Sequence, residues 1–167
     1  DPGKGVEEEL RTWREKFTVE DAKFKSRQGV PTYSAGVFYS GGCLDTLALI
    51  RSGFQPQWST EVDGQRAKMF EDLTNRKCLG DTFKNDFEKK SVCVLWTGQP
   101  CPDWSSSHQG RRPPGEEGKT GWQFVAQAEK ILEVDPHVCV IEMVPNALQV
   151  NDGESVVKLM AKLRSRY

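Results

Sequence analysis

The chain has 167 residues, of which 37% are hydrophobic, and this suits one domain with a buried core. Its 23 Lys and Arg residues balance 24 Asp and Glu residues, so the formal net charge of −1 neither requires nor excludes a nucleic-acid partner, and any basic surface must be local. The sequence has no signal-peptide pattern, no long apolar run without charges and no CxxC pair among its five cysteines. We therefore expect free thiols in an intracellular, reducing compartment, with no metal site and no membrane contact.

The first 31 residues are predicted to form a docking helix and a linker. Leu10, Trp13 and Phe17 fall on one helical stripe, and the next stretch runs without clear period to Pro31. From residue 32 to residue 167, short apolar runs alternate with helix-like segments. Such alternation predicts an α/β fold built from βαβ units, in which a mostly parallel sheet has helices on both faces and a ligand cleft lies at the carboxyl ends of the strands.

The first candidate site is the stretch "VFYSGGCLDTLALI", a predicted strand that turns through Ser40, Gly41 and Gly42 into a helix. A turn this tight lets backbone N–H groups and a helix N-terminus approach a ligand closely. A plain turn between a strand and a helix is the alternative, because two glycines alone are a weak signal.

Acidic residues follow the next two apolar runs. The predicted strand "PQWSTEVD" ends in Glu61 and Asp63, and the short run "KCLGD", predicted as a third strand, ends in Asp81. Glu61 is placed to accept hydrogen bonds from ribose hydroxyls, and Asp81 from the exocyclic amine of a base. Helix capping by Asp63 and ordinary turn chemistry at Asp81 are the alternatives. Three such strand ends together predict a cleft that binds a nucleoside.

The stretch "VLWTGQPCPDWS" ends a buried run with Cys101 between two prolines. Cys101 is surrounded by polar residues and glycines and is a candidate nucleophile, with a buried structural thiol as the alternative. Cys93 and Cys139 lie inside apolar runs and are predicted to be core thiols. Glu142 ends the run "HVCVIEMVPN" beside the same predicted cleft, where an acid needs a partner.

Residues 105 to 121 are too polar and too rich in Gly and Pro for regular structure, and they predict one long, mobile loop. A loop after the nucleophile could close over a base and neutralise phosphates, so Ser105, Arg111 and Arg112 are candidate DNA contacts. A solvated loop without a partner is the alternative.

Over residues 33 to 167, these motifs resemble the DNA (cytosine-5) methyltransferases. "FYSGGCLD" resembles the opening glycine motif of that family, "STEVD" its ribose-binding acid, and "GD" at residues 80 and 81 its adenine-binding aspartate. "GQPCPDWS" resembles the nucleophile motif and "IEMVPN" the glutamate motif, and these two in sequence are the specific part of the signal. The resemblance implies a Rossmann-like methyltransferase fold that depends on S-adenosylmethionine.

The resemblance also implies roles for individual residues. Cys101 would attack carbon 6 of a cytosine flipped out of double-stranded DNA, Glu142 would hydrogen-bond the ring, and S-adenosylmethionine would methylate carbon 5. The implied contacts with the cofactor are Phe38, Ser40, Gly41, Gly42, Leu44, Glu61, Val62, Asp81, Thr82 and Pro100.

Departures from the family pattern occur at several positions. Ser40 and Cys43 stand where glycines are usual, Pro102 replaces a glutamine, and Met143 replaces the asparagine that normally follows the glutamate. The family also continues beyond "LRSRY" with a target-recognition region. We therefore expect residues 32–167 to be a partial catalytic domain, truncated at its C-terminal end, whose further partner is the missing C-terminal half of the same protein.

Two other functions stay open. A relative that methylates RNA, or a catalytically weak relative that keeps the fold for binding, would share the same motifs. A thiol hydrolase that pairs Cys101 with His108 would leave Glu61, Asp81 and Glu142 unexplained. For the methyltransferase, we expect a nuclear location in a eukaryote and a cytoplasmic one in a prokaryote or virus.

Overall fold

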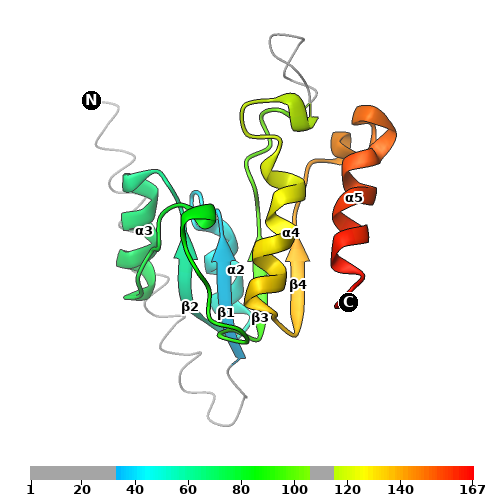
Figure 1. Cartoon of the computed structure of the whole chain (residues 1–167). Helices are drawn as coiled ribbons and strands as arrows, with labels where there is room; N and C mark the ends of the chain where they lie inside the picture. Colours follow the sequence, from blue (N-terminus) through cyan, green and yellow to red (C-terminus); the bar gives the residue numbers. More distant parts are fainter. Residues whose placement is uncertain (1–32, 106–114) are drawn as a thin grey trace, which may run out of the picture.

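The computed structural model describes residues 33–105 and 115–167, so the predicted N-terminal helix and linker lie outside the described residues. The described part contains a sheet of four strands, all parallel, in the order β2-β1-β3-β4 (Figure 1). The strands are β1 (Tyr33–Phe38), β2 (Phe54–Thr60), β3 (Val94–Thr97) and β4 (Val138–Ile141). The predicted α/β fold with a parallel sheet is confirmed.

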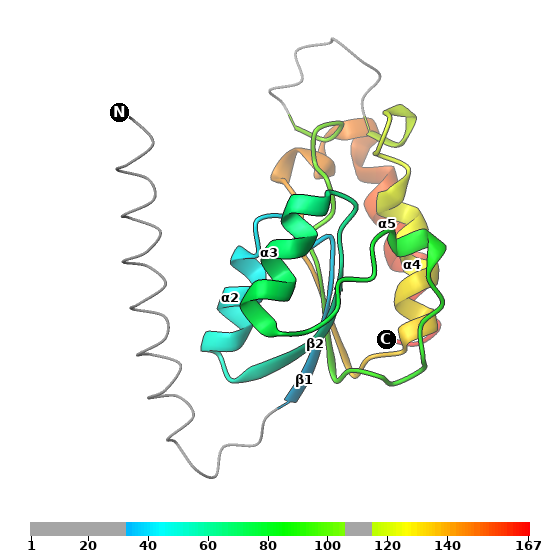
Figure 2. The same ribbon diagram turned by 90° about the vertical axis from the view of Figure 1, so that its left-hand side faces the viewer.

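Two helices lie on each face of the sheet, with α2 and α3 on one side and α4 and α5 on the other (Figure 2). The alternation of side chains along β1 produces these two layers. Ala35 and Val37 pack with Leu49 of α2, whereas Phe38 joins the larger core cluster under α4 and α5. The helices are α2 (Leu44–Arg51), α3 (Gly64–Thr74), α4 (Gln123–Val134) and α5 (Glu154–Leu163).

Helix α4 supplies most of the core on its face of the sheet. Its apolar residues recur at helical spacing, and Phe124, Ala128, Ile131 and Val134 are all at most 2% exposed. Burying a side chain the size of isoleucine stabilises a fold by roughly 1.5–3 kcal/mol. This stripe therefore anchors α4 firmly, and α4 in turn supports the segments that cross the carboxyl ends of the strands.

The run "KCLGD" is not the third strand that its apolar residues predict. It forms one isolated parallel bridge, between Cys78 and Ser59 of β2. Polar residues precede the bridge, and Gly80 then takes a left-handed backbone with φ 78°, so the chain leaves the sheet after a single pairing. Asp81 then begins a short 3₁₀ helix, η1 (Thr82–Lys84).

The chain after β4 forms two 3₁₀ turns, η4 (Pro145–Leu148) and η5 (Val150–Gly153), before α5 begins. The segment before α4 contains another 3₁₀ turn, η3 (Gly115–Glu117). At the end of the chain, Arg166 pairs with Asp135 and the Tyr167 hydroxyl donates to the Pro136 carbonyl at 2.7 Å. These contacts fix the end of the chain against the turn between α4 and β4.

All five cysteines are free, as the sequence predicts. Among residues 33–105 and 115–167, no helix combines the length and apolar character needed to cross a membrane. The same residues contain no group of three or more His, Cys, Asp or Glu side chains placed to hold a metal ion.

Candidate functional site

The topology brings the predicted site residues to one edge of the sheet. Because all four strands are parallel, their carboxyl ends, at Phe38, Thr60, Thr97 and Ile141, lie on the same side. Strands β1 and β3 are neighbours, and the chain leaves β1 toward β2 but leaves β3 toward β4. Such a reversal of strand order opens a crevice where doubly wound folds bind ligands.

The glycine turn after β1 is held tightly at its start. The Ser40 N–H donates to the Thr60 carbonyl at 3.0 Å, and the Cys43 N–H donates to the Ser40 carbonyl at 2.7 Å. Gly41 has φ 47° and Cys43 has φ 61°, both in the left-handed region that favours glycine. Beside Gly42, nothing lies within 4 Å of the position that a Cβ would take, so the turn has an open face.

Cys43 therefore occupies a backbone conformation in which a glycine would carry no strain. Burial raises the pKa of its thiol to about 11, and the charge of Asp45 adds to the rise. The thiol is protonated at neutral pH and is not a nucleophile.

Glu61 links the glycine turn to the end of β2. Its carboxylate accepts from the Gly41 N–H at 2.9 Å through one oxygen and from the Asp63 N–H at 2.9 Å through the other. Asp63 caps α3 by accepting from the Gln65 and Arg66 N–H groups, so the helix-capping alternative is correct for Asp63. Glu61 and the glycine turn thus meet, as the nucleoside cleft requires.

Asp81 and Thr82 lie next to the same strand end. The Thr82 hydroxyl is 2.7 Å from the Thr60 hydroxyl, and both side chains are buried. The Asp81 carboxylate accepts from the Phe83 N–H at 2.9 Å, which is the turn chemistry expected of an aspartate at this position. This hydrogen bond leaves the carboxylate able to accept others, because each carboxylate oxygen can accept more than one. The contact of Asp81 with an adenine therefore stays a prediction.

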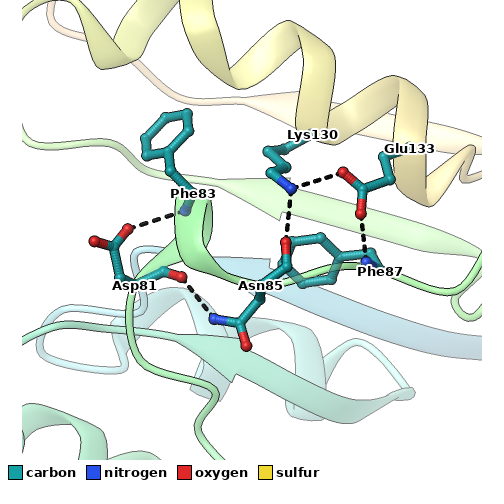
Figure 3. Close-up of polar contacts among 6 residues, drawn as sticks. All are labelled: Asp81, Phe83, Asn85, Phe87, Lys130 and Glu133. Atoms are coloured by element: carbon teal, nitrogen blue, oxygen red, sulfur yellow. Dashed lines mark hydrogen bonds and ion pairs between the residues drawn. The ribbon is translucent and has the colours of Figure 1, made fainter.

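A partly buried polar network ties the segment after Asp81 to α4 (Figure 3). Lys130 donates to the Asn85 carbonyl at 2.6 Å and to Glu133 at 2.8 Å, and the Phe87 N–H donates to Glu133 at 2.5 Å. Burial alone would raise the pKa of Glu133, but the hydrogen bonds from Lys130 and Phe87 lower it below its usual value. This network fixes the Asp81 end of the cleft against α4.

Cys101 lies in a tight turn after β3, and its side chain is half-buried. The Trp104 and Ser105 N–H groups both donate to its carbonyl oxygen, at 3.0 and 2.9 Å. The next residues hold the turn in place, because Trp104 is fully buried against Phe124 and its carbonyl accepts from the Asn146 amide at 2.8 Å. Cys101 is therefore held by its backbone.

The thiols of Cys93 and Cys139, which the sequence predicts to belong to the core, are half-buried. Cys139 packs against the main cluster, and burial raises the pKa of its thiol to about 12. A thiol whose pKa is raised is a poor nucleophile, which suits the structural role predicted for Cys139.

Glu142 follows β4 directly, and its N–H donates to the Thr97 carbonyl at 2.8 Å. Its side chain is exposed at the carboxyl edge of the sheet. Thr97 pairs with Ile141, so the two motifs that hold Cys101 and Glu142 leave adjacent strands at the same level. The structure therefore places both motifs on one edge.

Asp45 lies close to the predicted site residue Glu142, although the sequence did not single it out as a candidate. A Cβ on Gly98 would lie 3.8 Å from a Glu142 carboxylate oxygen and 4.0 Å from an Asp45 carboxylate oxygen, so both acids face the same space. Burial raises the pKa of Asp45, hydrogen bonds from Thr46 oppose this, and the charge of Glu142 adds to the rise. The sequence feature that could have identified Asp45 is its position in the first turn of the helix that follows the glycine motif.

An aromatic pair was also missed. The rings of Phe83 and Trp122 lie 4.8 Å apart, and Trp122 is 46% exposed at the start of α4. Phe38, in contrast, is fully buried against Trp58 and Phe87, whereas the predicted contacts Leu44 and Val62 are exposed. The cofactor roles of these predicted residues stay predictions.

A cavity of about 440 Å³ opens beside the turn of residues 101–105, which contains the predicted nucleophile Cys101. Its lining is neutral and combines polar and apolar groups, namely Ser105, Val144, Pro145, Asn146 and Gln149. Ser105, a predicted DNA contact, thus faces a space next to the turn. Arg111 and Arg112 lie outside the described residues.

Two solved structures were found to be similar to this chain. A protein described as a DNA modification methyltransferase encoded within an Escherichia coli prophage has a TM-score of 0.58 at 17% identity, over 80% of this chain and 38% of that one. This chain therefore spans less than half the length of that structure. A TehB-like SAM-dependent methyltransferase from Corynebacterium glutamicum has a TM-score of 0.48 at 9% identity, over 97% of this chain and 84% of that one.

The first likeness shows the fold, which is that of the Rossmann-like methyltransferases. No curated protein sequence matches the chain. A family model described as C-5 cytosine-specific DNA methylase matches residues 39–166, which include the glycine turn, Glu61, Cys101 and Glu142. The chain therefore belongs to the C-5 cytosine-specific DNA methylase family.

Proposed function

We propose that this chain transfers a methyl group from S-adenosylmethionine to carbon 5 of cytosine in DNA, with Cys101 as the nucleophile and Glu142 as its acidic partner. The observation that carries the proposal is the pairing of Thr97 with Ile141, completed by the hydrogen bond from the Glu142 N–H to the Thr97 carbonyl. A base bound at this edge would meet a thiol and a carboxyl group from neighbouring strands.

The residues present fit the cofactor. The open face beside Gly42 leaves room for a ligand next to backbone N–H groups and the start of α2. Glu61 keeps lone pairs for ribose hydroxyls, and the exposed face of Trp122 is available to an aromatic ring. When bound there, S-adenosylmethionine supplies an electrophilic methyl group.

Cys101 would act by making carbon 5 of the cytosine nucleophilic. Its thiolate forms a bond to carbon 6, and the electrons of the 5,6 double bond move toward the ring nitrogen. Glu142 donates a proton to that nitrogen and hydrogen-bonds the exocyclic amine, so charge on the ring is neutralised as it develops. After methylation, a water molecule acting as base takes the carbon 5 proton, and the double bond re-forms as the Cys101 thiolate leaves carbon 6. The ring nitrogen then returns its proton to Glu142, so that neutral 5-methylcytosine is released.

The DNA would enter along the edge that contains Ser105 and the neutral cavity beside it. Ser105, Arg111 and Arg112 are proposed to contact the backbone, where arginines neutralise phosphates. In duplex DNA the target must leave the base stack, which costs a few kcal/mol, whereas a single strand avoids most of that cost. A single-stranded substrate therefore tests the chemistry separately from base flipping.

The experiment measures exchange of the carbon 5 hydrogen. Addition of Cys101 makes carbon 5 basic, so a single-stranded oligonucleotide with tritium at that carbon should release tritium to water even without cofactor. Wild type and the control Cys93→Ser, at the opposite end of β3, should both release tritium. Cys101→Ser should release none, and Glu142→Gln should be slower by roughly 10²-fold or more.

Release that survives Cys101→Ser would contradict the proposal, as would absence of release from a folded wild-type chain. An RNA oligonucleotide of the same sequence serves as a second arm. Faster release from the RNA would contradict the assignment of DNA as the substrate.

A further inference from the structure

Asp103 lies two residues after Cys101 and is 1% exposed. One of its carboxylate oxygens accepts two hydrogen bonds from Thr120, from the N–H at 2.7 Å and from the hydroxyl at 2.7 Å. Its backbone carbonyl accepts from the Gly115 N–H, also at 2.7 Å. Asp103 thus joins the nucleophile turn to the segment that precedes α4.

The packing around this contact is specific to glycine. A Cβ on Gly118 would lie 2.2 Å from the Asp103 carboxyl carbon, and a Cβ on Gly121 would lie 1.6 Å from the Gly115 carbonyl oxygen. Real Cβ atoms do not approach so closely, so the Gly118 backbone lies directly against the carboxylate and the Gly121 backbone lies directly against Gly115. The contact is therefore enclosed within the protein.

The same backbone that directs the Asp103 side chain also directs Cys101. Asp103 sits inside the turn that the Trp104 and Ser105 N–H groups close onto the Cys101 carbonyl. A carboxylate that accepts two short hydrogen bonds is held more strongly than a neutral side chain in the same place. Releasing that carboxylate would free the turn to rotate, and the Cys101 sulfur would move with it.

We propose that Asp103 is a positioning residue for Cys101, and that its carboxylate, held by Thr120, fixes the turn that presents the sulfur. This inference rests on the proposed function, because it takes Cys101 to be the nucleophile. Its consequence is nevertheless a property of the thiol alone and can be measured without DNA or cofactor.

The test measures the rate at which iodoacetamide alkylates each cysteine of the full chain, with the modified sites mapped by mass spectrometry. In Asp103→Asn and in Thr120→Val, the rate at Cys101 should rise roughly tenfold, because the loss of a charge-assisted hydrogen bond is worth about that factor. Thr120→Ser keeps both donors and should alkylate at the wild-type rate. Asp86→Asn, at an exposed aspartate, is the matched control.

The other cysteines distinguish positioning from general loosening. Cys43 and Cys139 should stay protected in each variant, so that only the rate at Cys101 changes. If Asp103→Asn does not fold, Thr120→Val, which removes a single hydroxyl donor, decides the question alone.

An unchanged rate at Cys101, or an equal rise at Cys43 and Cys139, would overturn the proposal. Either result combined with normal tritium release would remove the role of Asp103 and leave the proposed function intact. A selective rise in the alkylation rate at Cys101, in a chain that releases no tritium, would support the role of Asp103 and contradict the proposed function.

Discussion

Replacing Glu61 with Gln tests whether the glycine turn and the end of β2 form one cofactor site. The Glu61 carboxylate accepts from the Gly41 N–H at 2.9 Å in a partly buried contact, and from the Asp63 N–H at 2.9 Å in an exposed one. A glutamine has one acceptor oxygen, so its NH₂ group would face one of these two donors. The substitution removes the negative charge of the side chain and one of its two acceptor oxygens, and it almost preserves the shape of the side chain.

The expected magnitudes follow from the exposure of the two bonds. The partly buried bond to Gly41 contributes about 1 kcal/mol, and the exposed bond to Asp63 a few tenths of a kcal/mol. For a chain of this size, a loss of about 1 kcal/mol lowers Tm by about 2–4 °C. Affinity for S-adenosylhomocysteine should fall further, by roughly tenfold or more, because Glu61 would also lose charge-assisted hydrogen bonds to the ribose.

Isothermal titration calorimetry and thermal unfolding measure the two effects on the same sample. Glu88→Gln, at an exposed position away from the turn, is the matched control and should change neither quantity. If Glu61→Gln lowered Tm but bound S-adenosylhomocysteine with unchanged affinity, Glu61 would be a structural link between β1 and β2, and the ribose role would be refuted. Unchanged Tm would refute the hydrogen-bond reasoning itself.

Four further substitutions test other parts of the structure. Because burial raises the pKa of Asp45 in the folded state, its ionisation lowers stability progressively as pH rises above about 3.8, its ordinary pKa. Asp45→Asn should therefore raise Tm at pH 7, and the gain should vanish below about pH 3.8, where Asp45 is protonated in both states. Glu142→Gln should lower the pKa of Asp45 in a carboxyl NMR titration, because the charge of Glu142 helps to raise that pKa. An unchanged pKa would contradict the proximity of Asp45 and Glu142. Gly121→Ala should prevent folding or cost several kcal/mol in urea unfolding, because its Cβ would clash with the Gly115 carbonyl. Lys130→Met should cost about 1 kcal/mol, because two partly buried acceptors lose their donor, and a variant of unchanged stability would contradict the network of Figure 3.

The parts of the fold that could be predicted are those in which local sequence and topology agree. Alternating apolar runs predicted the parallel sheet, and the rule that parallel strands end on one edge then predicted that Glu61, Cys101 and Glu142 would lie on that edge. The Gly41 contact with Glu61 and the pairing beside Glu142 follow directly from that rule.

The remaining features depend on contacts between distant segments. Asp103 and Thr120 meet across the turn before α4, and nothing in the local pattern of either residue indicates the other. Trp122 precedes the first residue of α4 and is 46% exposed, and its ring meets that of Phe83 from a distant segment. The run "KCLGD" was wrongly predicted as a strand because its apolar residues could not reveal that pairing with β2 stops after one bridge.

The most direct test of the central claim is covalent trapping at Cys101. Fluorine at carbon 5 of cytosine cannot leave as a cation, so after methyl transfer the Cys101 adduct cannot break down. A single-stranded oligonucleotide with 5-fluorocytosine, incubated with the chain and S-adenosylmethionine, should form a stable complex whose mass includes one methyl group and whose crosslink maps to Cys101. A crosslink at another cysteine, or an equal yield from Cys101→Ser, would contradict the account.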